Sequence, residues 1–290
     1  MISEINLDLQ AFAKRVYDSI LYQSTFYNFL NTAYIGTLRQ TGAPVIEVAK
    51  TTPTSVNVRS TREIQSALDP SLTTYSRTLV DLTELPMDYA IRVPVVITGS
   101  DITNAIQDAA DLEDAAIAKE IDTYGYKKLK GGVTTAKQWA PVTQADYIKA
   151  LNDLRAALFN KSVYGDYRLG LKATEYANLV SALTSVIHFE NLEVNNGVTL
   201  GEIARVYGIA IFEINDNLIN PVVADHTETV IGYFFNPIAV VGDTFFSAFV
   251  QTASDLRYPG YYCLSGNQLF GCEICRQDAI IKLQSEVVSG

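Results

Sequence analysis

The amino-acid sequence predicts an α+β fold built around one very long helix. Apolar and small residues recur at steps of three and four from Ile102 to Leu129, which corresponds to a helix roughly 42 Å long. Before this helix, residues 45–96 alternate apolar and polar side chains as strands do, and further strands close the chain. The sequence shows no repeat with the period of a solenoid protein.

Apolar residues at helical spacing predict an amphipathic helix near the N-terminus. The pattern covers residues 8–30 and includes Tyr27 and Leu30 towards its end. Lys14 and Arg15 are its only basic residues, which is fewer than the polar face of a membrane-surface helix usually carries. We therefore expect this helix to be buried, either against the protein's own core or against a partner.

Residues 45–96 predict a long β-arm that runs outward and returns. Three of its segments alternate as strands: VIEVAK, SVNVRS and MDYAIRVPVVI. A polar stretch with a turn at Asp69-Pro70 lies between the outgoing and returning halves. Because an isolated two-stranded arm is at best marginally stable in water, either its own domain or a neighbouring subunit must support it.

The long helix has clear start and stop signals. Ser100 or Asp101 follows Gly99 as its N-cap, and Lys130 with two following glycines ends it. Lysines crowd its end and acidic residues its first half, which suits the helix macrodipole. A Ca²⁺ site is the alternative use of these carboxylates, but without a glycine-bearing loop they usually form a solvated face. The acidic residues are Asp101, Asp108, Asp111, Glu113 and Asp114.

Two further helices are predicted after the long one. Residues 143–159 form a helical pattern with Thr143 as its cap, and residues 167–183 predict a strand followed by a helix. Trp139 precedes the first of them. We expect Trp139 to be a packing anchor, with a platform for a ligand as the alternative.

The last third of the chain mixes helices and strands. Residues 199–215 predict a short helix, a break at Gly208 and a buried strand. Residues 229–241 predict a strand and then a helix, joined at Asn236-Pro237. Three segments of the tail predict strands: YYCLSG, LFGCEIC and AIIKL.

The sequence predicts no catalytic, cofactor-binding or metal-binding site. Neither a glycine-rich phosphate loop nor a nucleophile-elbow motif is present. Cys272 and Cys275 form a C-x-x-C pair, but a zinc site needs a second pair of ligands, and in a strand these two thiols point to opposite faces. His188 and His226 lie beside no recognisable nucleophile. We therefore expect structural thiols and no enzyme activity.

Composition describes an acidic protein with a large core. Of the 290 residues, 48% are hydrophobic and 19% are charged; the 17 tyrosines suit either a surface for protein–protein contact or a tyrosine-rich core. The net charge of −10 argues against nucleic-acid binding through a basic face. Three cysteines exclude a disulfide framework. We expect neither a signal peptide nor a membrane span.

The order of these parts resembles the major capsid proteins of tailed bacteriophages, a family whose fold is named after phage Hong Kong 97. VPVVITGSDITNAIQDAADLEDAAIAKEID resembles the strand that leads into the family's spine helix, here residues 101–129. YRLGLKATEYANLVSAL and VYGIAIFEINDNL resemble stretches of its axial domain. GNQLFGCEICRQDAIIKLQSE resembles its closing strands. The resemblance covers nearly the whole chain, and the polar insert at 61–75 departs from it.

The resemblance implies a Hong Kong 97-like major capsid fold with four parts. These are an N-terminal arm (1–44), an extended β-hairpin called the E-loop (45–96), a peripheral domain (97–165 and 256–290) with the spine helix, and an axial α/β domain (166–255). In the family, the spine helix is the main structural support of the peripheral domain, and the adjacent subunit holds the β-arm.

The resemblance also implies a function in assembly rather than catalysis. Pentamers and hexamers of this chain would form an icosahedral virion head, assembled in the host cytoplasm, that encloses double-stranded DNA without sequence-specific binding. Implied partners are a portal, a separate scaffolding protein and decoration proteins, and no cofactor is implied. The main alternative is an encapsulin-type compartment that encloses cargo protein. Another virion part, such as a tail or adaptor protein, and an enzyme with an unrecognised site are the remaining alternatives.

Overall fold

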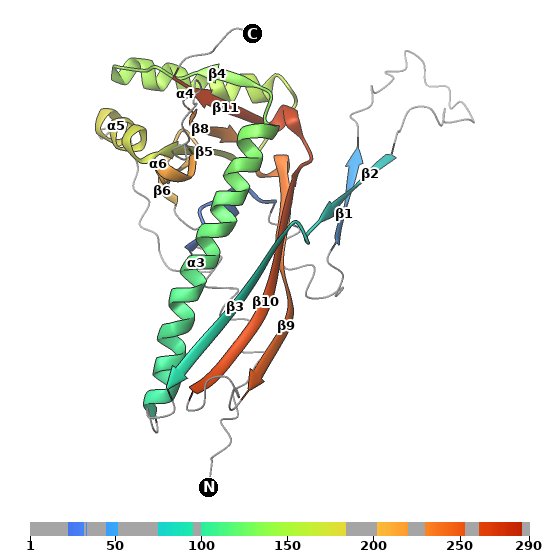
Figure 1. Ribbon diagram of the computed structural model, residues 1–290. Helices are drawn as coiled ribbons and strands as arrows, with labels where there is room; N and C mark the ends of the chain where they lie inside the picture. Colours follow the sequence, from blue (N-terminus) through green and yellow to red (C-terminus); the bar gives the residue numbers. More distant parts are fainter. Residues whose placement is uncertain are drawn as a thin grey trace, which may run out of the picture.

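Within the residues that it describes, the computed structural model combines helices with a two-stranded, a three-stranded and a six-stranded sheet (Figure 1). A long helix, α3 (Ser100–Gly132), runs beside the three-stranded sheet. The six-stranded sheet and shorter helices lie at one end of α3, and the two-stranded arm projects to one side. The described residues are 23–31, 33, 45–51, 75–94, 100–183, 202–219, 230–252 and 261–285.

Helix α3 confirms the predicted long helix and extends it slightly at both ends. It spans 33 residues and ends in the predicted pair of glycines, Gly131 and Gly132. Ile117, Ile121 and Leu129 are buried at helical spacing. This apolar side of the helix packs into the main core of the protein.

The three-stranded sheet is antiparallel throughout. β10 (Tyr261–Ile274) is its central strand, flanked by β3 (Leu85–Pro94) and β9 (Val240–Thr252). The tail segments YYCLSG and LFGCEIC therefore form one strand rather than the two that were expected. Local sequence around Gly266-Asn267 favours a turn, but pairing with a strand on each side keeps it extended. β9 is an additional strand that the sequence analysis does not predict.

The six-stranded sheet has the order β4-β11-β8-β5-β7-β6. All six residues of β8 are buried, and β11, from near the end of the chain, pairs with β4 on one side and β8 on the other. The sheet therefore joins segments that are far apart in the sequence. In spatial order, the strands are β4 (Ala136–Gln138), β11 (Ile280–Gln284), β8 (Val230–Phe235), β5 (Tyr167–Lys172), β7 (Ile209–Ile214) and β6 (Glu202–Val206).

Helix α4 (Gln144–Phe159) begins at its predicted cap. The Asp146 amide donates to Thr143 Oγ1 (3.3 Å), and the Asp146 carboxylate accepts from the Thr143 amide (2.9 Å), which makes a reciprocal capping box. Hydrogen bonds from Thr143 hold the pKa of Asp146 below its usual range. Strand β5 leads directly into α5 (Ala173–Leu183), as predicted.

Within the stretch 199–215, the described residues 202–214 form a hairpin, so the short helix expected there is wrong over these residues. β6 turns into β7 through Tyr207 and Gly208, whose φ angles are +53° and +76°. A two-residue turn with both φ angles positive matches the twist of a hairpin. Pairing between the two strands therefore overrides the local helical pattern in β6.

Short 3-10 turns lie in two regions where helices were expected, and for the N-terminal one most of the predicted helix is not among the described residues. In residues 229–241 the turn is η3 (Pro237–Ala239), because β9 already begins at Val240. Within the helical pattern over residues 8–30, the structure has η1 (Phe26–Phe29); residues 1–22 lie outside the described residues. The remaining short elements are α6 (Asp216–Ile219) and η4 (Gln277–Ala279).

The arm is a two-stranded sheet of β1 (Val45–Thr51) and β2 (Tyr75–Asp81). β1 confirms the strand predicted from VIEVAK. The return strand differs from the prediction: it is β2, whereas most of MDYAIRVPVVI forms β3 and pairs with β10. SVNVRS and the turn at Asp69-Pro70 lie outside the described residues.

Candidate functional site

The base of the β-arm rests on a small apolar cluster. Leu82, in the turn after β2, is fully buried there, and Val241 and Cys275 complete the cluster from the other side. Burial of such side chains contributes about 1.5–3 kcal/mol each, which fixes the base of the arm to the body. Alternate residues of β1 and β2 contribute the rest: Ile46, Val48 and Val80.

Gly271 of β10 lets the turn after β2 lie directly against the three-stranded sheet. A Cβ at this position would overlap the Asp81 carbonyl oxygen and would lie 2.7 Å from Leu82 Cα. The Asp81 carboxylate accepts hydrogen bonds from the Thr83 amide (2.8 Å) and hydroxyl (2.7 Å), which close the turn. These bonds hold the pKa of Asp81 below its usual range.

A charged cluster connects this turn to α3. Lys128 Nζ lies 2.6 Å from Glu84 Oε2 and 2.9 Å from Glu273 Oε2 of β10. Tyr124, one helical turn before Lys128, donates its hydroxyl to the same oxygen of Glu84. Burial opposes the charge of Lys128, but the hydrogen bonds to the two carboxylates raise its pKa above the usual range. Three elements are thereby held around one ammonium group.

One buried carboxylate clamps the N-terminal segment to α3. Asp122 Oδ1 accepts hydrogen bonds from Ser24 Oγ (2.5 Å) and the Phe26 amide (2.9 Å). Asp122 Oδ2 accepts from the Thr25 amide (3.2 Å) and hydroxyl (3.0 Å). Burial raises the pKa of Asp122, although these hydrogen bonds act in the opposite direction. The clamp satisfies donors that would otherwise be buried without partners.

Phe26 fills a notch in α3 next to this clamp. The notch exists because residue 125 is glycine, and a Cβ there would overlap the Phe26 ring. The Phe26 ring stacks on Phe29 at 5.6 Å between centroids, and Phe29 stacks on Phe235 of β8 at 4.1 Å. The N-terminal segment thus joins α3 to the six-stranded sheet within a single core.

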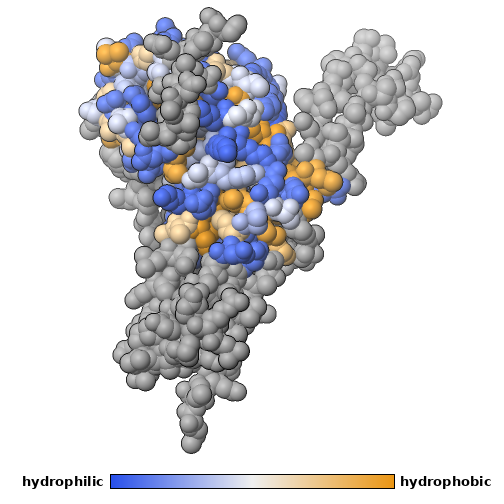
Figure 2. Space-filling view, viewed as in Figure 1, coloured by the Kyte–Doolittle hydropathy of each residue, from blue (hydrophilic) through white to orange (hydrophobic). Residues whose placement is uncertain are grey.

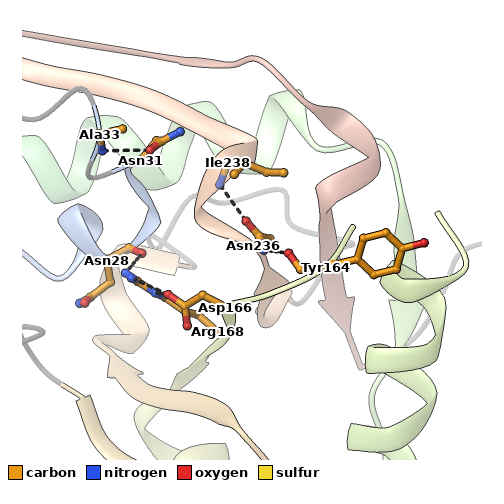
Figure 3. Close-up of polar contacts among 8 residues, drawn as sticks. All are labelled: Asn28, Asn31, Ala33, Tyr164, Asp166, Arg168, Asn236 and Ile238. Carbon is orange, nitrogen blue, oxygen red and sulfur yellow. Dashed lines mark hydrogen bonds and ion pairs between the residues drawn. The ribbon is translucent and has the colours of Figure 1, made fainter. Parts of the chain in front are cut away.

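Polar contacts continue this connection along the N-terminal segment (Figure 3). Arg168 of β5 donates from Nη1 to the Asn28 carbonyl (2.9 Å), and its Nε and Nη2 donate to Asp166. The Asn31 amide donates to the carbonyl of Val240, the first residue of β9 (2.9 Å). Residues 24–31 therefore contact α3 and both larger sheets.

The C-x-x-C pair consists of two buried thiols that form no disulfide. Cys272 packs in the main core and Cys275 in the arm-base cluster, so the two side chains face different cores, as the strand pattern predicted. Burial raises the pKa of Cys272 to about 12. The Cys272 thiol is therefore protonated at neutral pH and is not a nucleophile.

The predictions for the other residues singled out in the sequence are confirmed at some positions and wrong or untested at others. Trp139 is a buried anchor that packs edge-on against Tyr147, as predicted. Asp114 is 2% exposed, so the prediction of a solvated face is wrong for this residue. His188 and His226 lie outside the described residues. Across the described ranges, no three His, Cys, Asp or Glu side chains are grouped to hold a metal ion.

None of the described helices is long and apolar enough to cross a membrane.

Local sequence patterns did not identify the residues that position the arm and the N-terminal segment. Gly271 did carry a signal, because a glycine inside a strand pattern indicates close approach of another backbone. Asp122 and Glu84 carried none, since their partners are distant in the sequence.

Solved structures of other proteins resemble the fold of this chain over most of its length. No protein-family model and no curated protein matches the sequence. The capsid of Ralstonia phage GP4 matches the structure with a TM-score of 0.55 and 8% identity, over 85% of this chain and 84% of that chain. The capsid of cyanophage P-SCSP1u matches with a TM-score of 0.53 and 16% identity, over 83% of each chain.

This chain has a phage capsid fold. A structure of Mycobacterium phage Che8 also matches, with a TM-score of 0.54 and 16% identity over 90% of this chain and 91% of that chain. At such low identities the likeness concerns the fold alone. In this chain, both the base of the arm and the N-terminal segment are attached to the body around α3, through the Glu84–Lys128 contact, the Asp122 clamp and the apolar cluster at the arm base.

Proposed function

We propose that this chain is the major capsid protein of a tailed phage, with a Hong Kong 97-like fold. Its copies assemble through pentamers and hexamers into the icosahedral head that encloses the double-stranded DNA genome. The observation that carries the proposal is the match to two phage capsids over 83% and 85% of the chain. The protein then acts by forming contacts between copies rather than by catalysis.

The structure of the arm supports assembly between copies. β1 and β2 pair only with each other among the described strands, and a two-stranded ribbon is at best marginally stable in water. The body fixes the base of the arm through Lys128, Glu84 and the arm-base cluster. A neighbouring copy is the support that we propose for the remainder.

We propose a division of the chain that follows the sheets. Residues 1–44 form the N-terminal arm and residues 45–96 the E-loop. α3 and the three-stranded sheet form the peripheral domain, and the six-stranded sheet with α4 and α5 forms the axial domain. Relative to the expected ranges 97–165, 166–255 and 256–290, β4, α4 and β11 move to the axial domain and β9 to the peripheral domain, because they pair or pack there.

Assembly in this proposal relies on many modest contacts. Head-to-tail contacts between identical chains close into rings when the rotation between copies permits it. Because many identical contacts act together, each one need not be strong. A scaffolding protein, a portal and decoration proteins take part as separate chains, and the head is built in the host cytoplasm.

The test is to express the full chain, with and without the neighbouring genes, and to examine it by size-exclusion chromatography and negative-stain electron microscopy. We expect pentamers, hexamers or closed particles. A chain that stays monomeric under every condition would overturn the proposal. Closed particles that contain cargo protein instead of DNA would support the encapsulin-type alternative over the phage head.

A further inference from the structure

Exposed apolar side chains gather at two places on the described surface. Of the six large apolar side chains that are exposed in the described residues, five belong to one of two surfaces. Val142 is the sixth, and it lies apart from both, just before the cap of α4. Concentration of exposed apolar area in this way indicates contact surfaces.

The first surface, which we call the aromatic-basic surface, is formed by Arg155, Phe159, Lys161, Tyr164 and Tyr207. Phe159 and Tyr164 pack edge to face, with ring centroids 4.9 Å apart, although they are 56% and 59% exposed. Arg155 lies one turn before Phe159 on α4 and donates to the Tyr207 carbonyl at 3.5 Å. Lys161 is exposed in the loop between the two packed rings.

The backbone holds this surface in a fixed shape. Asn236 Nδ2 donates to the Tyr164 carbonyl (3.2 Å), with the Tyr164 ring directed away from Asn236 (Figure 3). The Tyr167 hydroxyl donates to the Val163 carbonyl (2.7 Å), which anchors the same loop from β5. A surface that is already ordered loses less entropy when it binds a partner.

Tyr207 is an unfavourable choice for its own hairpin. Its φ of +53° lies in the left-handed region, where asparagine or glycine is strongly preferred at the first position of such a turn. Tyr207 is 46% exposed, so a large part of its surface is available to a partner. A residue kept against its conformational preference indicates a use for its side chain outside the chain.

The second surface, which we call the acidic arm face, is the outer side of the arm base. It consists of Val45, Glu47, Leu79 and Asp81, which the pairing of β1 with β2 places on one face, and all four are exposed. Leu79 is 67% exposed. In Figure 2, hydrophobic and hydrophilic side chains lie side by side where the arm leaves the body.

We propose that the aromatic-basic surface of one copy binds the acidic arm face of a second copy. Each surface combines apolar side chains with charges, and the charges are opposite: Arg155 and Lys161 lie on the first surface, Glu47 and Asp81 on the second. β6 and the arm lie on opposite sides of the molecule in Figure 1, so one chain cannot join its own two surfaces. The contact is therefore heterologous, the kind that forms rings. This inference rests on the proposed function and assigns residues to it.

The first experiment uses Tyr207→Asn, which separates folding from assembly. Asparagine tolerates the left-handed turn better than tyrosine, so we expect the Tm of the isolated chain to stay equal or rise. Assembly, followed by light scattering as a function of protein concentration, should require a protein concentration about tenfold higher because an aromatic contact is lost. Phe159→Ser should weaken assembly similarly, whereas Val142→Ser should leave it unchanged.

The second experiment tests the head-to-tail geometry by mixing two variants. Tyr207→Asn keeps the acidic arm face, and Leu79→Arg keeps the aromatic-basic surface. Each variant alone should fail to form rings at the concentration where wild-type chains assemble. Their mixture should form one-to-one dimers that do not grow, measured by analytical ultracentrifugation.

Assembly of Tyr207→Asn, Phe159→Ser and Leu79→Arg at the wild-type concentration would overturn this inference and leave the proposed function intact. Mixtures in which no heterodimer forms would likewise overturn it. Failure of the wild-type chain itself to form any oligomer is a different result, because it would overturn the proposed function first.

Discussion

Asp122 joins two segments through a single carboxylate. Its two oxygens accept four hydrogen bonds from residues that lie 96 to 98 positions earlier in the chain. Asp122 is only 4% exposed. A buried carboxylate costs free energy unless its oxygens are hydrogen-bonded, and here all four of these donors come from the N-terminal segment.

Replacing Asp122 by asparagine should release this clamp. The amide of asparagine would place a donor against the Thr25 amide and hydroxyl, which are themselves donors. We expect Asp122→Asn to lower the free energy of unfolding by about 1–3 kcal/mol, measured by urea denaturation of the isolated chain. Asp153→Asn, at an exposed carboxylate on α4, is the matched control and should have little effect.

The pH dependence of this difference has a definite sign. Because burial raises the pKa of Asp122 above its ordinary value of 3.8, the folded state binds the proton more tightly than the unfolded state. The resulting contribution to stability is complete below the unfolded pKa and is lost as pH rises through the folded pKa. The stability of wild type relative to Asp122→Asn should therefore decrease across that interval. An increase would contradict the raised pKa.

Lys128 is the residue that neutralises two carboxylates at the arm base. Lys128→Met leaves Glu84 and Glu273 facing each other without a cation, while the apolar stem is retained. Because the three side chains are 23%, 34% and 43% exposed, we expect a loss of at most about 1 kcal/mol. The loss should shrink in about 1 M salt. Lys127→Met, at the exposed neighbouring position, should cost less, and equal losses at both positions would contradict the role of the cluster.

At the scale of elements, the direction of the arm depends on a close approach of two backbones. The turn after β2 lies against β10 only because residue 271 is glycine. The apolar cluster below it and the Lys128 cluster beside it then fix the first residues of the arm. The base is thus attached by several contacts where it leaves the body.

Adding one methyl group at Gly271 should displace the arm. In Gly271→Ala the new Cβ meets backbone atoms of Asp81 and Leu82, which cannot rotate away. We expect a loss of about 1–3 kcal/mol in stability and weaker assembly, measured by thermal unfolding and by light scattering. Gly131→Ala, at the end of α3 where a Cβ meets nothing within 4 Å, should be neutral. Similar losses in both variants would show that the close approach is unimportant.

At the scale of the whole molecule, the net charge affects how strongly the proposed shell would bind the DNA that it encloses. The net charge of −10 disfavours tight adhesion to a polyanion. We expect the isolated chain to show no tight binding to duplex DNA at about 0.15 M salt, measured by fluorescence anisotropy. A tight affinity for duplex DNA that falls steeply with added salt would contradict a shell that encloses DNA without binding it tightly.

The fold also shows which elements could be predicted from local sequence patterns. The long helix, the Thr143 cap, the strand and helix from 167 to 183 and the first strand of the arm are all present where the sequence predicted them. Each of these is specified by residues within one or two turns of helix or one strand. Local pattern also predicted that Cys272 and Cys275 face different sides.

Strand pairing explains where the local patterns failed. β6 carries a helical pattern and β9 carries no clear one, yet both are strands because a neighbour pairs with them. The arm returns at β2 rather than at residues 85–94 because β10 offers the latter a longer partner. Pairing energy depends on which distant segment arrives alongside, and a single stretch of sequence does not contain that information.

The sequence by itself therefore determined the composition, the main helices and the order of parts that resembles a capsid protein. Only the tertiary structure decided which residues hold the arm and the N-terminal segment. Asp122, Glu84 and Gly271 act through partners 40 to 190 positions away. Their contributions come from burial and from close contact between distant backbones, which exist only once the chain has folded.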